Sequence, residues 1–108
     1  MLRDMPTLER EVLRYTGLIE AEMRRIGLWQ SEPLKPEQLQ FTQAFAIDTV
    51  AFSQWLQFVF LPRAREAAEA NRLPRSSSVA AQALREFDGD AEAEPLLTLL
   101  ADFDSLFD

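Results

Sequence analysis

The chain has 108 residues, of which 47% are apolar and 27% charged, and it contains neither cysteine nor histidine. This length suits one domain. The formal charge of −7 disfavours direct binding to nucleic acid, which requires Lys and Arg to neutralise phosphates. The missing residue types exclude disulfides, thiolate nucleophiles and the commonest general base and transition-metal ligand.

The first predicted helix covers about residues 7–26. Its apolar residues recur at steps of three and four, the pattern of an amphipathic helix, and they are Leu8, Val12, Tyr15, Ile19, Met23 and Ile26. We expect Thr7 to cap this helix and Gly27 to end it. Two prolines disfavour helix in the connection over residues 27–36. That connection also holds apolar residues, so we expect it to lie on the core.

Residues 41–61 form the most apolar stretch of the sequence. Its polar residues exclude a membrane span, which needs about 20 predominantly apolar residues. Asp48 and Thr49 mark an internal boundary, and either of them can cap a helix that begins near residue 50. On that helix the apolar residues cover most of the circumference and leave only a thin polar strip at Ser53, Gln54 and Gln57. We therefore expect residues 50–61 to be a buried central helix.

Pro62 follows this helix directly. Because proline lacks an N–H, we expect a bend at Pro62, with the helix continuing until Asn71 and Pro74 end it. A serine-capped third helix is predicted over about residues 78–87. We expect four of its side chains to face inward: Val79, Ala83, Leu84 and Phe87. Asp88-Gly89-Asp90 is typical of a turn.

The final predicted helix covers about residues 92–107. Pro95 suits its first turn, and its apolar stripe runs through Leu96, Leu99, Leu100, Phe103, Leu106 and Phe107. Residues 86–108 hold eight acidic residues and no basic one. Several of these carboxylates lie at the negative end of the helix dipole. This arrangement predicts a terminus that is frayed or is neutralised by arginines of the same chain or of a partner.

No segment shows the alternation of apolar and polar residues that is typical of strands. The sequence therefore predicts an all-α fold, in which a single bundle of four or five helices packs around the buried helix at about residues 50–61.

Two short segments carry a resemblance to a known family. Phe45-Ala46-Ile47-Asp48-Thr49, followed by the run from Trp55 to Arg63, resembles the signature of the YqcC-like family, which comprises small bacterial helical proteins of unknown function. The resemblance implies one multihelical domain over residues 1–108, with an acidic final helix and no catalytic residues. Genes of this family often lie beside one for a tRNA pseudouridine synthase, which implies a link to RNA metabolism by association.

Nine residues are candidates for interaction with a partner: Trp29, Asp48, Trp55, Gln57, Pro62, Arg63, Phe103, Leu106 and Phe107. Trp and Arg are enriched at interface hot spots, so Trp29, Trp55 and Arg63 could form a recognition surface. The interpretation that we favour is structural and places Trp55 in the core, with Pro62 at a bend.

Asp48 and the segment from Asp102 to Asp108 each allow a functional and a structural interpretation. Asp48 is either a buried acid suited to proton transfer or, as we favour, a helix cap. The segment from Asp102 to Asp108 either docks in a groove of a partner or, as we favour, completes the core with Phe103, Leu106 and Phe107. The arginines could gather into one basic face, but glutamates at helical spacing favour ion pairs within helices.

We expect a cytoplasmic protein with no catalytic activity, no cofactor and no metal site. Our first hypothesis is a non-catalytic module that binds another protein. The second is an accessory factor in tRNA modification, with a tRNA-modifying enzyme as a candidate partner. The third is a carboxylate-based enzyme, which the absence of His, Cys and a phosphate loop disfavours. The sequence leaves the oligomeric state open.

Overall fold

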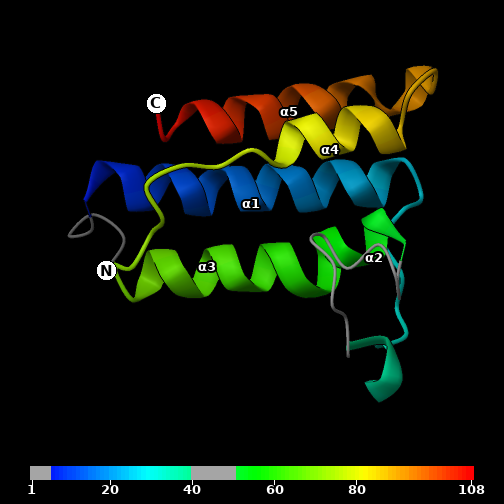
Figure 1. The fold of residues 1–108 in the computed structure, drawn as a ribbon, viewed down its shortest axis with the longest axis horizontal. Coiled ribbons are helices and arrows are strands. Elements are labelled where there is room, and N and C mark those ends of the chain that lie inside the picture. Colours follow the sequence, from blue (N-terminus) through cyan, green and yellow to red (C-terminus); the bar gives the residue numbers. More distant parts are fainter. Residues whose placement is uncertain (1–5, 40–50) are drawn as a thin grey trace.

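The computed structural model describes residues 6–39 and 51–108, which contain helices and no strand (Figure 1). Helix α1 (Thr7–Arg25) lies between α3 (Leu61–Glu69) on one side and α5 (Glu94–Ser105) on the other, and α4 (Val79–Glu86) packs against α5. The shorter elements are η2 (Pro36–Leu39), α2 (Phe52–Trp55), η4 (Leu56–Phe60) and η5 (Ala91–Ala93). The predicted all-α bundle is confirmed.

Helix α1 has nearly the predicted bounds, but its first cap differs from the prediction. Pro6 occupies the N-cap position, and no side chain makes a capping hydrogen bond there, so Thr7 is not the cap. The predicted end is correct, because Gly27 has a φ of +78°. That left-handed conformation lets the Leu28 N–H donate to the Met23 carbonyl oxygen at 2.8 Å.

Helices α2, η4 and α3 follow one another without a break from Phe52 to Glu69. Pro62 has no N–H to offer to the Phe58 carbonyl, and the turn just before it widens to a π-helix, in which the Leu61 N–H donates to the Leu56 carbonyl. The prediction for Pro62 was a bend; the structure has a π-helix over Leu56–Phe60, directly before α3 and its Pro62. The N-cap of this helix is Ala51, not Asp48 or Thr49, which both lie outside the described residues.

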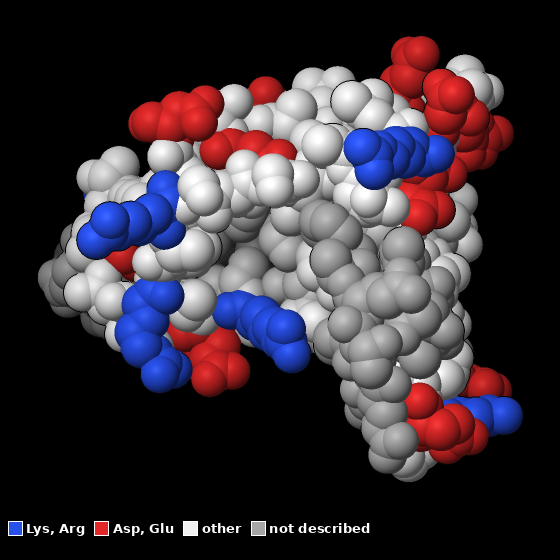
Figure 2. Space-filling view, in the orientation of Figure 1, with Lys and Arg blue, Asp and Glu red and all other residues white. Residues whose placement is uncertain are grey.

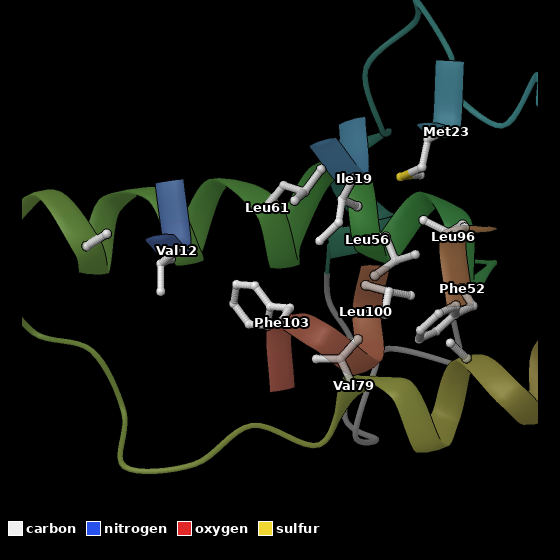
Figure 3. Close-up of a cluster of buried hydrophobic side chains, with 12 residues drawn as sticks. Val12, Ile19, Met23, Phe52, Leu56, Leu61, Val79, Leu96, Leu100 and Phe103 are labelled. Atoms are coloured by element: carbon white, nitrogen blue, oxygen red, sulfur yellow. The ribbon is translucent and has the colours of Figure 1, made fainter. Parts of the chain in front are cut away.

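The core lies where α1, the Phe52–Glu69 helix and α5 converge (Figure 3). Each contributes fully buried side chains, including Ile19 from α1, Leu56 from η4 and Leu100 from α5. The segment expected to be central is only partly enclosed, because Trp55, Phe58 and Phe60 are half-buried. Helix α1 instead contacts both α3 and α5 and occupies the middle of the bundle.

Helix α4 buries one narrow face against α5. Val79 and Ala83 are buried as predicted, and the ring of Phe87 meets that of Phe52 edge-on with centroids 5.9 Å apart. Leu84 is 58% exposed, contrary to the prediction, because it follows Ala83 and so points about 100° away from it around the helix. The predicted turn at residues 88–90 is confirmed, with Gly89 at φ +80°.

The acidic helix α5 packs on its own chain. Leu96, Leu100 and Phe103 are buried in the core, and Leu99, Leu106 and Phe107 pack against it. None of the helices within the described ranges combines the length and hydropathy needed to cross a membrane.

Candidate functional site

A surface pocket of about 250 Å³ lies between α3, the connection from α3 to α4, and the end of α5. Most of its lining is apolar. The lining residues are Trp55, Phe60, Arg63, Ala64, Ala67, Leu73, Pro74, Ser76, Ser77, Phe103 and Phe107. The pocket therefore joins two parts of the chain that lie far apart in the sequence, residues 55–77 and residues 103–107.

Aromatic rings form one side of this pocket and connect it to the core. Trp55 stacks on Phe60 with ring centroids 5.5 Å apart, and Phe60 meets Phe103 edge-on at 5.1 Å. Phe103 in turn lies 5.5 Å from Phe107. Such contacts fix the orientation of each ring relative to the next. The aromatic wall is thus held in place by the fold.

Helix α3 provides the floor of the pocket. Phe60, Ala64 and Ala67 follow one another at steps of four and three, so they share one helix face. The two alanines leave space where larger side chains would fill the face. At the end of α3, Asn71 adopts a φ of +57°, and the connection that follows supplies Leu73 and Pro74 to the pocket.

Of the described residues that line the pocket, Arg63 alone is charged. Its side chain is exposed and makes no ion pair with any residue that the structure describes. Arg63 also borders a second hollow, which it shares with Ala67, Arg72 and Glu66. Figure 2 shows this face of the molecule, hollowed beside α3 and with Lys and Arg side chains along the border of the hollow.

Three other arginines form ion pairs with glutamates of the same chain. Arg24 pairs with Glu20 and Arg25 pairs with Glu22, as helical spacing predicted. Arg25 holds the pKa of Glu22 below its ordinary value through a hydrogen bond. Arg65 was expected to pair along its own helix, but it crosses to α1 and contacts Glu20 at 2.8 Å. No common basic face forms from these arginines.

Four of the nine candidate interaction residues line the pocket: Trp55, Arg63, Phe103 and Phe107. Leu106 is half-buried against the core, and Pro62 is exposed. Asp48 lies outside the described residues, so its role stays a prediction. The pocket thus unites two regions that the sequence presented separately, the Trp55–Arg63 run and the final helix.

Trp29 and Gln57 lie elsewhere and hold the connection after α1 in place. The Arg24 guanidinium stacks over the Trp29 ring, 4.7 Å from its centroid. Gln57 was expected on a polar strip, but it is buried. Its amide group bonds both main-chain groups of Gln30, accepting from the N–H at 3.0 Å and donating to the carbonyl at 2.7 Å. These contacts attach the connection after α1 to α1 and to the Phe52–Glu69 helix.

Sequence reasoning missed Leu73, Pro74 and the two alanines. For the alanines, the signal is that small residues at positions 64 and 67 follow Phe60 on the same face of the Phe52–Glu69 helix. An apolar Leu73-Pro74 pair in a polar connection was the second signal.

The chemistry available in the pocket is binding chemistry. Its apolar wall can exclude water from an apolar group, and the Arg63 guanidinium can contact an anion at its border. Among the lining residues that the structure describes, none is a carboxylate that could act as a base. Among the described residues, no group of three or more acidic side chains is arranged to hold a metal ion.

Comparison with known proteins places this geometry in a wider context. Residues 11–106 match the family model described as tRNA pseudouridine synthase C. An uncharacterized protein of Haemophilus influenzae is 32% identical over 92% of this chain and 94% of its own length. The solution NMR structure of protein YqcC from Escherichia coli superposes with a TM-score of 0.82 at 29% identity, covering 94% of this chain and 89% of that chain.

A third relative is much longer. A protein of Pectobacterium carotovorum named tRNA pseudouridine synthase C is 39% identical over 63% of this chain, but the match covers only 18% of that protein. The similar segment is therefore a small part of a larger polypeptide.

Proposed function

The chain belongs to the YqcC-like family, and from that premise we propose that it is a non-catalytic module that binds a tRNA pseudouridine synthase through the pocket beside Arg63. The absence of His and Cys supports a non-catalytic role, because proton transfer and nucleophilic attack most often depend on them. The pocket supports binding, because it is mostly apolar, open at the surface and bordered by Arg63, which pairs with none of the described residues.

The choice of a tRNA pseudouridine synthase as the partner rests on the longer relative. In the Pectobacterium carotovorum protein, a segment similar to this chain occurs in a polypeptide named tRNA pseudouridine synthase C. Covalent linkage raises the effective concentration of two modules that act together. When the modules are separate chains, a binding surface has to replace that linkage. We infer that the pocket is this surface and that the chain binds the enzyme through it.

Binding between the two purified proteins of one organism tests this proposal. Calorimetry of the intact chain with a tRNA pseudouridine synthase C is expected to give a stoichiometric complex. The variant Ala67→Leu fills the pocket floor with a good helix former and is expected to weaken the complex at least tenfold. The control Ala81→Leu adds the same side chain at an exposed position of α4, outside the lining, and is expected to leave affinity unchanged.

Two outcomes would contradict the proposal. If no complex forms, the synthase is not the partner. If Ala67→Leu and Ala81→Leu bind equally well, the pocket is not the surface. A tRNA titration separates the alternative of an accessory RNA-binding role, which predicts direct binding that weakens steeply with salt.

A further inference from the structure

We propose that the pocket beside Arg63 recognises a polypeptide segment that presents a large aromatic side chain next to a carboxylate. The choice of a polypeptide rests on the proposed function above, whereas the chemistry of the segment rests on the pocket itself. The aromatic side chain enters the pocket, and the carboxylate pairs with the Arg63 guanidinium at its border.

The size and wall of the pocket favour an aromatic ring. An apolar cavity of about 150 Å³ is large enough to bind benzene. At about 250 Å³, the pocket holds a phenyl ring together with the carbon that attaches it to a backbone. The rings of Phe60, Phe103 and Phe107 line the pocket, and an aromatic side chain that enters it can make with them the edge-to-face contacts that aromatic pairs prefer.

The charges around the pocket favour an acidic neighbour for that ring. Although the whole chain carries a formal charge of −7, the described part of the pocket lining has one charged residue, and it is an arginine. The adjoining hollow holds Arg63 and Arg72 against a single Glu66, whose contact with Arg72 is long, at 3.5 Å. This surface therefore carries a local positive charge that attracts a carboxylate and disfavours a basic segment.

The position of Arg63 favours a chain over an isolated ring. Arg63 and Ala67 belong to both hollows, so the two meet along α3. A ligand that fills the first hollow and extends past Arg63 enters the second. An extended peptide has this shape, because its successive side chains point to opposite sides.

Titration of the intact ¹⁵N-labelled chain with short synthetic peptides tests the inference by NMR. The probe peptide has a central phenylalanine flanked by aspartates, and its matched peptides carry lysines in place of the aspartates or alanine in place of phenylalanine. The aspartate peptide is expected to shift the Trp55 indole N–H and the Ser76 and Ser77 amide signals. Both matched peptides are expected to bind at least tenfold more weakly.

Charge reversal at Arg63 supplies the control. Arg63→Glu is expected to weaken the aspartate peptide about tenfold or more and to strengthen the lysine peptide, because a charge-assisted contact is replaced by repulsion. Arg85→Glu on α4 produces the same change in net charge away from the pocket, and it is expected to change either affinity less than twofold.

The inference is overturned if the two variants behave alike, if the three peptides bind equally, or if free 3-phenylpropionate binds as tightly as the aspartate peptide. No synthase is present in this titration. Selective peptide binding without a synthase complex would therefore overturn the partner alone, and a synthase complex without peptide selectivity would overturn this inference alone.

Discussion

Asp104 shows how one carboxylate near the end of α5 fixes the start of α4. Its Oδ1 accepts from the Val79 N–H at 3.1 Å and from the Ser77 hydroxyl, and its Oδ2 accepts from the Ala80 N–H at 2.8 Å. Ser78 occupies the N-cap position but makes no capping bond with its side chain. The sequence predicted a terminus that is frayed or neutralised by arginines; for Asp104, the structure instead places the carboxylate on backbone N–H groups at the N-terminus of α4.

At the residue scale, we expect Asp104→Ala to destabilise the protein. Loss of a capping carboxylate costs about 0.5–2 kcal/mol, because the freed N–H groups lose their acceptor. The free energy of unfolding, measured by urea denaturation, gives the value directly. The control Asp102→Ala removes an exposed carboxylate from the same helix, and we expect a change within about 0.5 kcal/mol. Equal midpoints for the two variants would contradict the capping role.

At the element scale, one cluster of polar contacts joins α1 to α3. The Arg65 guanidinium donates from Nη2 to the Glu20 carboxylate at 2.8 Å and from Nε to the Thr16 hydroxyl at 3.2 Å. The hydrogen bond from Arg65 to Glu20, together with one from Arg24, holds the pKa of Glu20 below its ordinary value. The folded chain therefore binds a proton at Glu20 less readily than the unfolded chain does.

This difference in pKa makes part of the stability dependent on pH. The contribution of Glu20 is complete above its ordinary pKa of 4.5 and is lost as the pH falls through the lowered value. We expect Glu20→Gln to unfold more easily at pH 7, by about 1 kcal/mol or less because solvent screens this partly exposed pair. The variant should also lose less stability than the wild type between pH 6 and pH 3, as measured by urea titrations at each pH.

A second glutamate–arginine pair provides the control. Glu66 and Arg72 are 75% and 71% exposed and lie 3.5 Å apart, so Glu66→Gln should leave both the stability at pH 7 and its pH dependence nearly unchanged. If Glu20→Gln retains the full loss of stability in acid, its carboxylate does not contribute as argued.

At the scale of the whole molecule, local patterns predicted more of the fold than of the pocket. The periodicity of α1 and α5, Gly27 at the end of α1 and Gly89 in the turn are local signals, and the structure bears them out. The capping of α4 by Asp104 and the pairing of Arg65 with Glu20 join residues 24 or more positions apart. No spacing rule along one helix reveals such pairs, and the pocket depends on the same kind of long-range placement.

The position of α5 leads to the last prediction. The acidic final segment was expected either to complete its own core or to dock on a partner, and Leu100 is fully buried against α1 and the Phe52–Glu69 helix. Leu100→Ala should therefore destabilise the whole bundle by about 2–5 kcal/mol, through lost apolar contact and the cavity left behind. The exposed Leu84→Ala should change stability by less than about 0.5 kcal/mol.

Far-UV circular dichroism follows all the helices, whereas fluorescence follows Trp29 and Trp55, which lie outside α5. If residues 1–108 form one domain, both probes must shift together in Leu100→Ala. A shift in circular dichroism alone would mean that α5 unfolds separately from the rest of the bundle.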